Sequence, residues 1–242
     1  MRDHSVIGGR RGGLLLVVAA AVAGVIVLGF ALASQEPAPP SPPGSAVGTI
    51  DPSPATSQDR TPSADPTPDR PEPEHDVVGA AEEVPLGASE PVSVSIPAID
   101  VRTEVIALGK APDGTLAVPQ PGPNLDKAAW FEDSPTPGQP GPSVIEGHVA
   151  TEQRGPSVFF NLGNLRPGDK ISVEREDGKV AVFTVDGLRD FDKDTFPTKL
   201  VYGGNLSTPT LRLITCSDFD ASIGHHTGNL VVFSHLTRVR GA

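Results

Sequence analysis

The sequence predicts an all-β domain: a closed or nearly closed barrel of about eight strands with short helices. Three observations predict it. Between Pro91 and Arg240, short apolar runs are repeatedly broken by turn-forming residues. Runs such as VSVSIPAI (Val92–Ile99) alternate with period two, which is typical of strands. Only SVFFNLGNL (Ser157–Leu165) has helical spacing, and it is short. Many short strands with frequent turns favour a barrel, and about 150 residues is a common size for one domain.

The expected strands follow one another along the chain. The first half holds VSVSIPAI, TEVIALG, TLAVP after the turn PDG (Pro112–Gly114), and PSVIEGHVA (Pro142–Ala150). KISVERE and KVAVFTVDGLRDF, joined at Asp177–Gly178, are typical of a hairpin. The runs TLRLITC and NLVVFSHL (Asn229–Leu236) complete the set.

The N-terminus predicts a membrane anchor. Residues 1–12 carry three arginines against one acid, and residues 13–33 are uncharged and mostly Ala, Val and Leu. Twenty apolar residues in a helix match the roughly 30 Å of a bilayer core. A cleaved signal peptide is the alternative, but its apolar region is usually only 7–15 residues long. We expect residues 1–12 in the cytoplasm and the rest of the chain outside the cell membrane, which it crosses once.

Residues 34–90 differ in composition from the segments on either side. They are rich in proline, serine, threonine and acids, with few large apolar residues. Such a segment cannot bury enough apolar surface to fold, so we expect a disordered, extended stalk. Residues 91–242 then form the globular domain at the end of this stalk.

Charge and cysteine content exclude several classes of protein. The net charge of −11 argues against nucleic-acid binding. A single cysteine excludes an internal disulfide framework, so an extracellular domain would carry one free thiol. We identify no metal-ligand pattern and expect a monomer.

That cysteine, Cys216, ends the buried run TLRLITC, and the polar residues that follow it predict a loop. A small buried hydrophobe is the alternative interpretation. A thiol acts as a nucleophile when it is activated, usually by histidine. His148 is the candidate partner because it also lies at a strand end, but the sequence alone leaves open whether the two share one rim of the barrel.

Six segments in order resemble the sortase family of cysteine transpeptidases, most closely its actinobacterial class F. They are PVSVSIPAIDV, LGKAPDGTLAVP, PGQPGPSVIEGHV, RGPSVFFNLGNLRPGDKISV, DKDTFPTKLVYG and LRLITC. The resemblance implies an eight-stranded barrel, with Cys216 as the catalytic thiol and His148 as the catalytic histidine. It also implies cleavage of an LPXTG-like sorting signal through a thioacyl-enzyme and transfer to an amine, such as that of a peptidoglycan precursor. No cofactor is implied.

The resemblance to sortases also implies a third site residue, an arginine near the start of the last strand that helps to hold the substrate and the oxyanion. This chain departs from that pattern. Between Ser217 and Asn229 there is no arginine, and the loop offers His225 and His226 instead. We expect His226 or His225 to support the oxyanion and substrate. Two alternatives remain: a degenerate, non-catalytic module that binds sorting signals or wall peptides, and a thiol hydrolase that releases its substrates to water.

Overall fold

The structure is a computed structural model that describes residues 38–42, 85–151 and 154–241. The expected anchor (13–33) and nearly all of the expected stalk (34–90) lie outside these residues. In the part of the chain that is described, no helix has the length and apolarity needed to cross a membrane.

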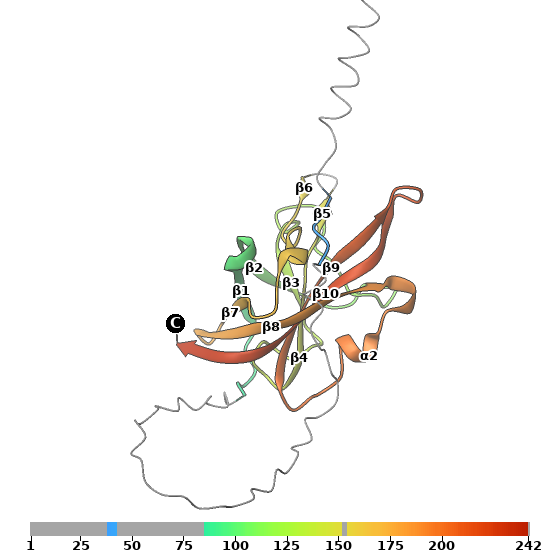
Figure 1. Cartoon of the computed structure of the whole chain (residues 1–242). Helices are drawn as coiled ribbons and strands as arrows, with labels where there is room; N and C mark the ends of the chain where they lie inside the picture. Colours follow the sequence, from blue (N-terminus) through green and yellow to red (C-terminus); the bar gives the residue numbers. More distant parts are fainter. Residues whose placement is uncertain (1–37, 43–84, 152–153, 242) are drawn as a thin grey trace, which may run out of the picture. The chain divides into compact units, whose positions relative to one another are not determined.

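Eight strands form a closed barrel in the order β1-β2-β3-β4-β9-β10-β8-β7, which confirms the expected fold class (Figure 1). The barrel closes because β1 pairs with β7 as well as with β2. The pairs β2–β3 and β4–β9 are parallel, and the other neighbours are antiparallel. The strands are β1 (Pro91–Ile96), β2 (Val101–Leu108), β3 (Ala128–Phe131), β4 (Gly141–Glu146), β7 (Lys170–Arg175), β8 (Lys179–Asp192), β9 (Pro209–Asp220) and β10 (His225–Gly241).

The remaining elements are short and lie in the connections between barrel strands. They are β5 (Ala150–Thr151), β6 (Gly155–Pro156), the 3-10 helices η2 (Pro97–Ile99), η3 (Leu162–Asn164) and η4 (Lys193–Thr195), and the helix α2 (Thr198–Val201). The segment with helical spacing therefore forms only the single turn η3. The expected hairpin around Asp177–Gly178 is confirmed by the antiparallel pairing of β7 with β8.

The core has two parts, inside and outside the barrel wall. Alternate residues such as Val94, Ile96, Ile171 and Val173 fill the interior and are fully buried. A second cluster lies on the outer face of β4, β9 and β10, and comprises Val144, Val201, Ile214, Val231 and Phe233 with partly buried aromatic neighbours. Strand β4 is covered on both faces, so all six of its residues are buried.

Two of the expected strands differ in the structure. TLAVP forms only an isolated bridge between Lys110 and Leu116. Its place in the barrel is taken by β3, whose sequence AAWF has no strand-like alternation. Strand β3 is held by hydrogen bonds to β2 and β4, which lie elsewhere in the chain, so no local sequence pattern predicts it.

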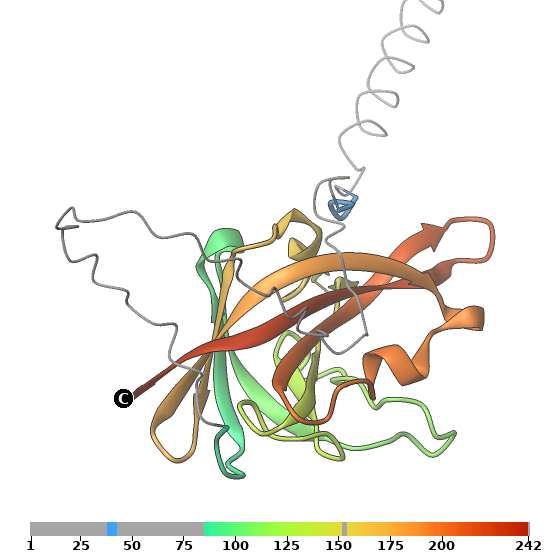
Figure 2. The ribbon, with the colours of Figure 1, turned by 60° about the horizontal axis from the view of Figure 1, so that its bottom comes forward.

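The loop expected after Cys216 is also different. Strand β9 continues to Asp220 and pairs with the start of β10, with Asn229 opposite Cys216 and His225 opposite Asp220. This hairpin projects beyond the barrel (Figures 1 and 2). Backbone pairing with β10 keeps these polar residues extended, although Asp218 adopts a left-handed conformation (φ 53°) within the strand.

The folded domain begins before Pro91. Leu86 packs against the interior core, and its backbone amide donates to the carbonyl of Gly138 (2.8 Å). Arg175, which is almost fully buried, donates to the carbonyl of Gly87 (2.8 Å). The last residues of the expected stalk are therefore part of the barrel's packing.

Candidate active site

The parallel pairing of β4 and β9 brings the end of β4 beside the middle of β9. Glu146 lies opposite Ile214, and the amide of Gly147 donates to the carbonyl of Ile214 (3.1 Å). The buried hydroxyl of Thr215 donates back to the carbonyl of Gly147 (2.8 Å). Two residues further along each strand direction are His148 and Cys216. Alternation along β9 puts Cys216 on the same face as Ile214, and His148, just beyond β4, lines the same cavity as Glu146.

His148 and Cys216 line one open cavity of about 800 Å³. Its wall comes from the ends of β4 and β9, from residues 110–118 and from the segment between β8 and β9; further lining residues include Phe131, Glu146, Lys193, Phe196, Tyr202, Ile214 and Asn229. This volume is in the range of small-ligand and peptide-side-chain pockets. The two candidates that the sequence could not assign to one rim are thus at the same cavity.

Within the described part of the chain, the His148 ring makes one hydrogen bond. Nε2 lies 2.8 Å from the carbonyl oxygen of Pro119. A carbonyl oxygen can only accept, so Nε2 carries the hydrogen and Nδ1 is the free nitrogen of the neutral ring. Behind the histidine, Gly147 allows close packing, because a Cβ there would lie 2.7 Å from Phe159 and Val158.

Cys216 is a half-buried free thiol with a cation beside it. The ammonium Nζ of Lys193, from η4, lies 3.7 Å from Sγ of Cys216. Asn229 is the cross-strand partner of Cys216 on β10 and lines the same cavity. The sequence does not single out either residue: Lys193 reaches the thiol because the long strand β8 ends beside it, and Asn229 is predicted only as the first residue of the last strand.

The two adjacent histidines lie elsewhere, in the β9–β10 hairpin. His226 Nδ1 is 3.2 Å from the carbonyl of Ser217, and His225 Nδ1 is 3.1 Å from the carbonyl of Ile223. Neither histidine is among the residues that line the cavity. Burial lowers the pKa of His226, and the nearby Lys193 lowers it further, so a charged His226 is disfavoured at neutral pH. Their support of the oxyanion stays a prediction, and Lys193 and Asn229 are better placed for it.

Glu146 is an unexpected member of the cavity wall. The side chain is 5% exposed, and Oε1 has no hydrogen-bond partner among the described residues. Burial raises the pKa of Glu146 to about 8. The carboxyl in turn contributes to a raised pKa of Tyr202, for which burial is the larger cause.

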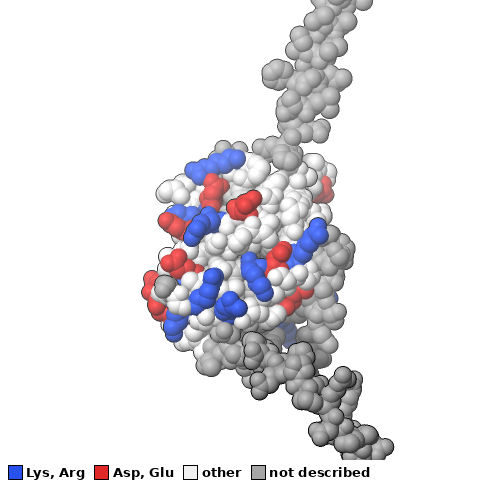
Figure 3. Space-filling model, turned by 60° about the vertical axis from the view of Figure 1, so that its left-hand side comes forward, with Lys and Arg blue, Asp and Glu red and all other residues white. Residues whose placement is uncertain are grey.

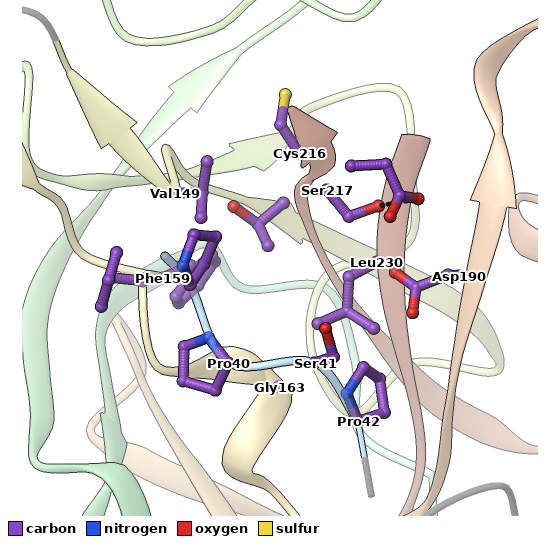
Figure 4. A pocket seen from close by; sticks show the side chains of 14 residues that line it. Pro40, Ser41, Pro42, Val149, Phe159, Gly163, Asp190, Cys216, Ser217 and Leu230 are labelled. Carbon is purple, nitrogen blue, oxygen red and sulfur yellow. Dashed lines mark hydrogen bonds between the residues drawn. The ribbon is translucent and has the colours of Figure 1, made fainter. Parts of the chain in front are cut away.

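A second, smaller cavity of about 40 Å³ lies on the other side of the β9 end (Figure 4). Pro39–Pro42, from the expected stalk, lines it together with Phe159, Gly163 and Leu230. Pro40 packs so closely that a Cβ on Gly163 would clash with its carbonyl oxygen. In Figure 4 the sulfur of Cys216 points away from Pro40 and Pro42, so this segment covers the end of the barrel and not the thiol.

A family model for the sortase domain matches residues 94–237, which is more than half of the chain and includes both His148 and Cys216. The chain belongs to the sortase family. No curated protein matches this sortase. Among the described residues there is no group of three His, Cys, Asp or Glu side chains that could hold a metal ion.

Solved structures of several sortases are similar to this one. Sortase A from Listeria monocytogenes is 18% identical and has a TM-score of 0.46, with 64% of this chain and 92% of that chain covered. Sortase A from Corynebacterium diphtheriae is 21% identical with a TM-score of 0.48, and 62% of each chain is covered. Sortase C-1 from Actinomyces oris is 20% identical with a TM-score of 0.48, covering 62% of this chain and 76% of that chain.

Proposed function

We propose that this sortase is a membrane-anchored extracellular cysteine transpeptidase of class F. It would cleave an LPXTG-like sorting signal and transfer it to an amine of a cell-wall precursor or of another protein. The observation that carries the proposal is the shared cavity of Cys216 and His148, with the ammonium of Lys193 at 3.7 Å from the sulfur. Family membership supports the reaction class.

The proposed reaction has two halves. In the first, Nδ1 of His148 takes the thiol proton of Cys216, and the resulting thiolate attacks the carbonyl carbon of the scissile bond and forms a tetrahedral oxyanion. The carbon–nitrogen bond then breaks, His148 gives a proton to the departing amine, and a thioester remains. In the second, an incoming amine attacks the thioester, His148 takes its proton, and Cys216 leaves as thiolate. The hydrogen bond to Pro119 supports this role because it fixes the ring and leaves Nδ1 free.

Lys193 and Asn229 would together stabilise the oxyanion and the substrate, which is the role of the arginine that this chain lacks. The ammonium of Lys193 stabilises negative charge on the sulfur or on the developing oxyanion. The carboxamide of Asn229, opposite Cys216 on β10, supplies a hydrogen-bond donor in the same cavity. A flexible lysine places charge less rigidly than an arginine does, so a second, neutral donor is a reasonable complement.

The proposed location at the cell membrane rests on the sequence of residues 13–33 and 34–90. An uncleaved apolar helix and a proline-rich stalk would hold the enzyme outside the cell, at the membrane that also carries its substrates. N-terminal sequencing of the protein from its native membrane tests this location. A mature N-terminus near residue 34, with the protein free in the medium, would contradict it and favour a signal peptide.

The transpeptidase proposal is tested by incubating the full-length protein with LPXTG-like peptides, with and without a small amine, and following masses. We expect a thioacyl adduct on Cys216 and an amine-dependent ligated product. Release to water alone would favour the hydrolase, and binding without any adduct would favour the non-catalytic module.

A further inference from the structure

Glu146 is a buried acid that the proposed reaction does not use. It lies on the outer face of β4, between Val144 of the outer core cluster and the candidate His148. Among the described residues, no hydrogen bond satisfies its Oε1. An unpartnered buried polar group lowers the stability of the fold, and an aliphatic side chain would pack there without that cost. A group with this cost and no structural partner is a candidate for binding a ligand.

The surroundings of Glu146 define what it can bind. Apolar and aromatic side chains dominate the nearby wall, with Ile214 opposite on β9, Phe131 on β3 and Tyr202 after α2. The titratable and charged groups at the same cavity are Lys110, Asp133, His148, Lys193, Tyr202 and Cys216. None of them is hydrogen-bonded to Glu146, so its carboxyl is available to a molecule in the cavity.

The location along the strand sets which part of a peptide can reach it. Glu146 is paired with Ile214, which precedes Cys216 by two residues in β9, or about 7 Å along an extended strand. A bound peptide in extended conformation covers the same distance in two residues. The residue facing Glu146 is therefore about two positions from the carbonyl that meets Cys216.

We propose that Glu146 is a specificity-determining residue that selects an uncharged hydrogen-bonding side chain, a hydroxyl or a carboxamide, about two positions from the scissile bond. This inference rests on the proposed function, since it names the substrate class of the same cavity. A carboxylic acid can both donate and accept, which matches these groups.

The charges at the cavity argue against the other polar substrates. A lysine or arginine of the peptide would meet the ammonium of Lys193, whereas Lys110 is already paired with Asp133 (3.3 Å), and its own charge would have to be desolvated beside Glu146. Burial keeps Glu146 protonated at neutral pH, which removes the negative charge that a cationic side chain would need as partner. An apolar side chain would leave the carboxyl unpaired.

The test uses full-length protein and a peptide library scanned at the positions on either side of the scissile bond. The variants are Glu146→Gln, Glu146→Met and Glu146→Leu, with the exposed Glu176→Leu as a matched control. We expect the wild type and Glu146→Gln to be acylated faster with Ser, Thr, Asn or Gln at one position than with Val or Leu. Glu146→Met and Glu146→Leu should lose or reverse this preference by roughly ten- to hundredfold, and the control should keep it.

Binding is measured separately from chemistry in the Cys216→Ala background, as the peptide-induced rise in unfolding temperature. A polar preference in binding without any acylation of the wild type would overturn the proposed function and keep the inference. If Glu146→Met is acylated with the same polar preference as the wild type, the inference about Glu146 is wrong but the proposed function stands. A wild-type preference for Lys, Arg or apolar residues would have the same meaning. Glu146→Met, which is close to Glu in shape, serves if Glu146→Leu does not fold.

Discussion

At the scale of single residues, Cys216 and His148 illustrate what the sequence can establish. Each lies at the end of an apolar run, and the resemblance to a family singles out each of them. Lys193 and Glu146 carry no such signal. Lys193 stands in an ordinary polar stretch, and Glu146 looks like the exposed end of a strand until the outer cluster covers it. Their importance depends on contacts between distant segments, which no local pattern encodes.

Lys193 provides the first test at this scale. We expect Lys193→Ala to lower kcat/KM by roughly 10²-fold, the scale of a lost oxyanion donor, and Lys193→Arg to retain most of it. Asn229→Ala should also reduce the rate. Lys199→Ala, an exposed lysine of α2 outside the cavity lining, is the control. The rates are measured with one LPXTG-like peptide. A lower kcat/KM in His226→Ala, with full activity in Lys193→Ala, would mean that His226 and not Lys193 supports the oxyanion.

Glu146 gives the fold a pH dependence. Its pKa is about 8 in the folded state against 4.5 for the model compound, so the folded protein holds a proton that the unfolded chain releases. The contribution of Glu146 to the free energy of unfolding should therefore be fully present below about pH 4.5 and fall by on the order of a few kcal/mol as the pH rises to 8. Denaturant titrations at several pH values should show a flatter profile for Glu146→Gln. An equal slope in both proteins would contradict the buried, protonated carboxyl.

At the scale of elements, the parallel pair β4–β9 positions the site. Thr215→Val removes the hydroxyl that bonds the carbonyl of Gly147 and should cost about 1–3 kcal/mol of stability. It should also lower kcat, because His148 follows Gly147 directly. Ser234→Ala is the matched control, since its buried hydroxyl donates to the carbonyl of Leu211 (3.0 Å), outside the cavity lining. Equal effects of both variants on kcat would mean that this hydrogen bond does not position the site.

Pro39–Pro42 covers one end of the barrel and should contribute to its stability. Gly163→Ala forces a Cβ against the carbonyl of Pro40, so the segment must move. We expect a loss on the order of 1 kcal/mol in unfolding free energy with no change in the alkylation rate of Cys216, whose sulfur faces the other way. Gly87→Ala, where nothing lies within 4 Å, is the control. Faster alkylation in Gly163→Ala would mean that the segment shields the thiol.

The strands differ in how well the sequence predicts them. The hairpin β7–β8 follows from alternation and an Asp-Gly turn, both of which are local. Strand β3 does not, because β2 and β4 supply the hydrogen bonds that keep AAWF extended. The extension of β9 beyond Cys216 pairs with the start of β10 across a short turn, and its polar composition favours a loop although the backbone continues the ladder. In both places the backbone pairing, which composition does not encode, decides the element.

At the scale of the whole molecule, the 242-residue chain carries a net charge of −11. Figure 3 shows basic and acidic side chains interspersed on the face it presents, without a continuous basic patch.

The central proposal, that Cys216 and His148 act together as nucleophile and acid–base, is tested most directly by intact-mass analysis of the acyl-enzyme. We expect the wild type to gain the mass of the cleaved peptide on Cys216 and to lose it on adding an amine. Cys216→Ala should form no adduct, and His148→Ala should form it roughly 10²–10⁴-fold more slowly while remaining folded. An adduct on a residue other than Cys216, or an unchanged rate in His148→Ala, would contradict the proposal.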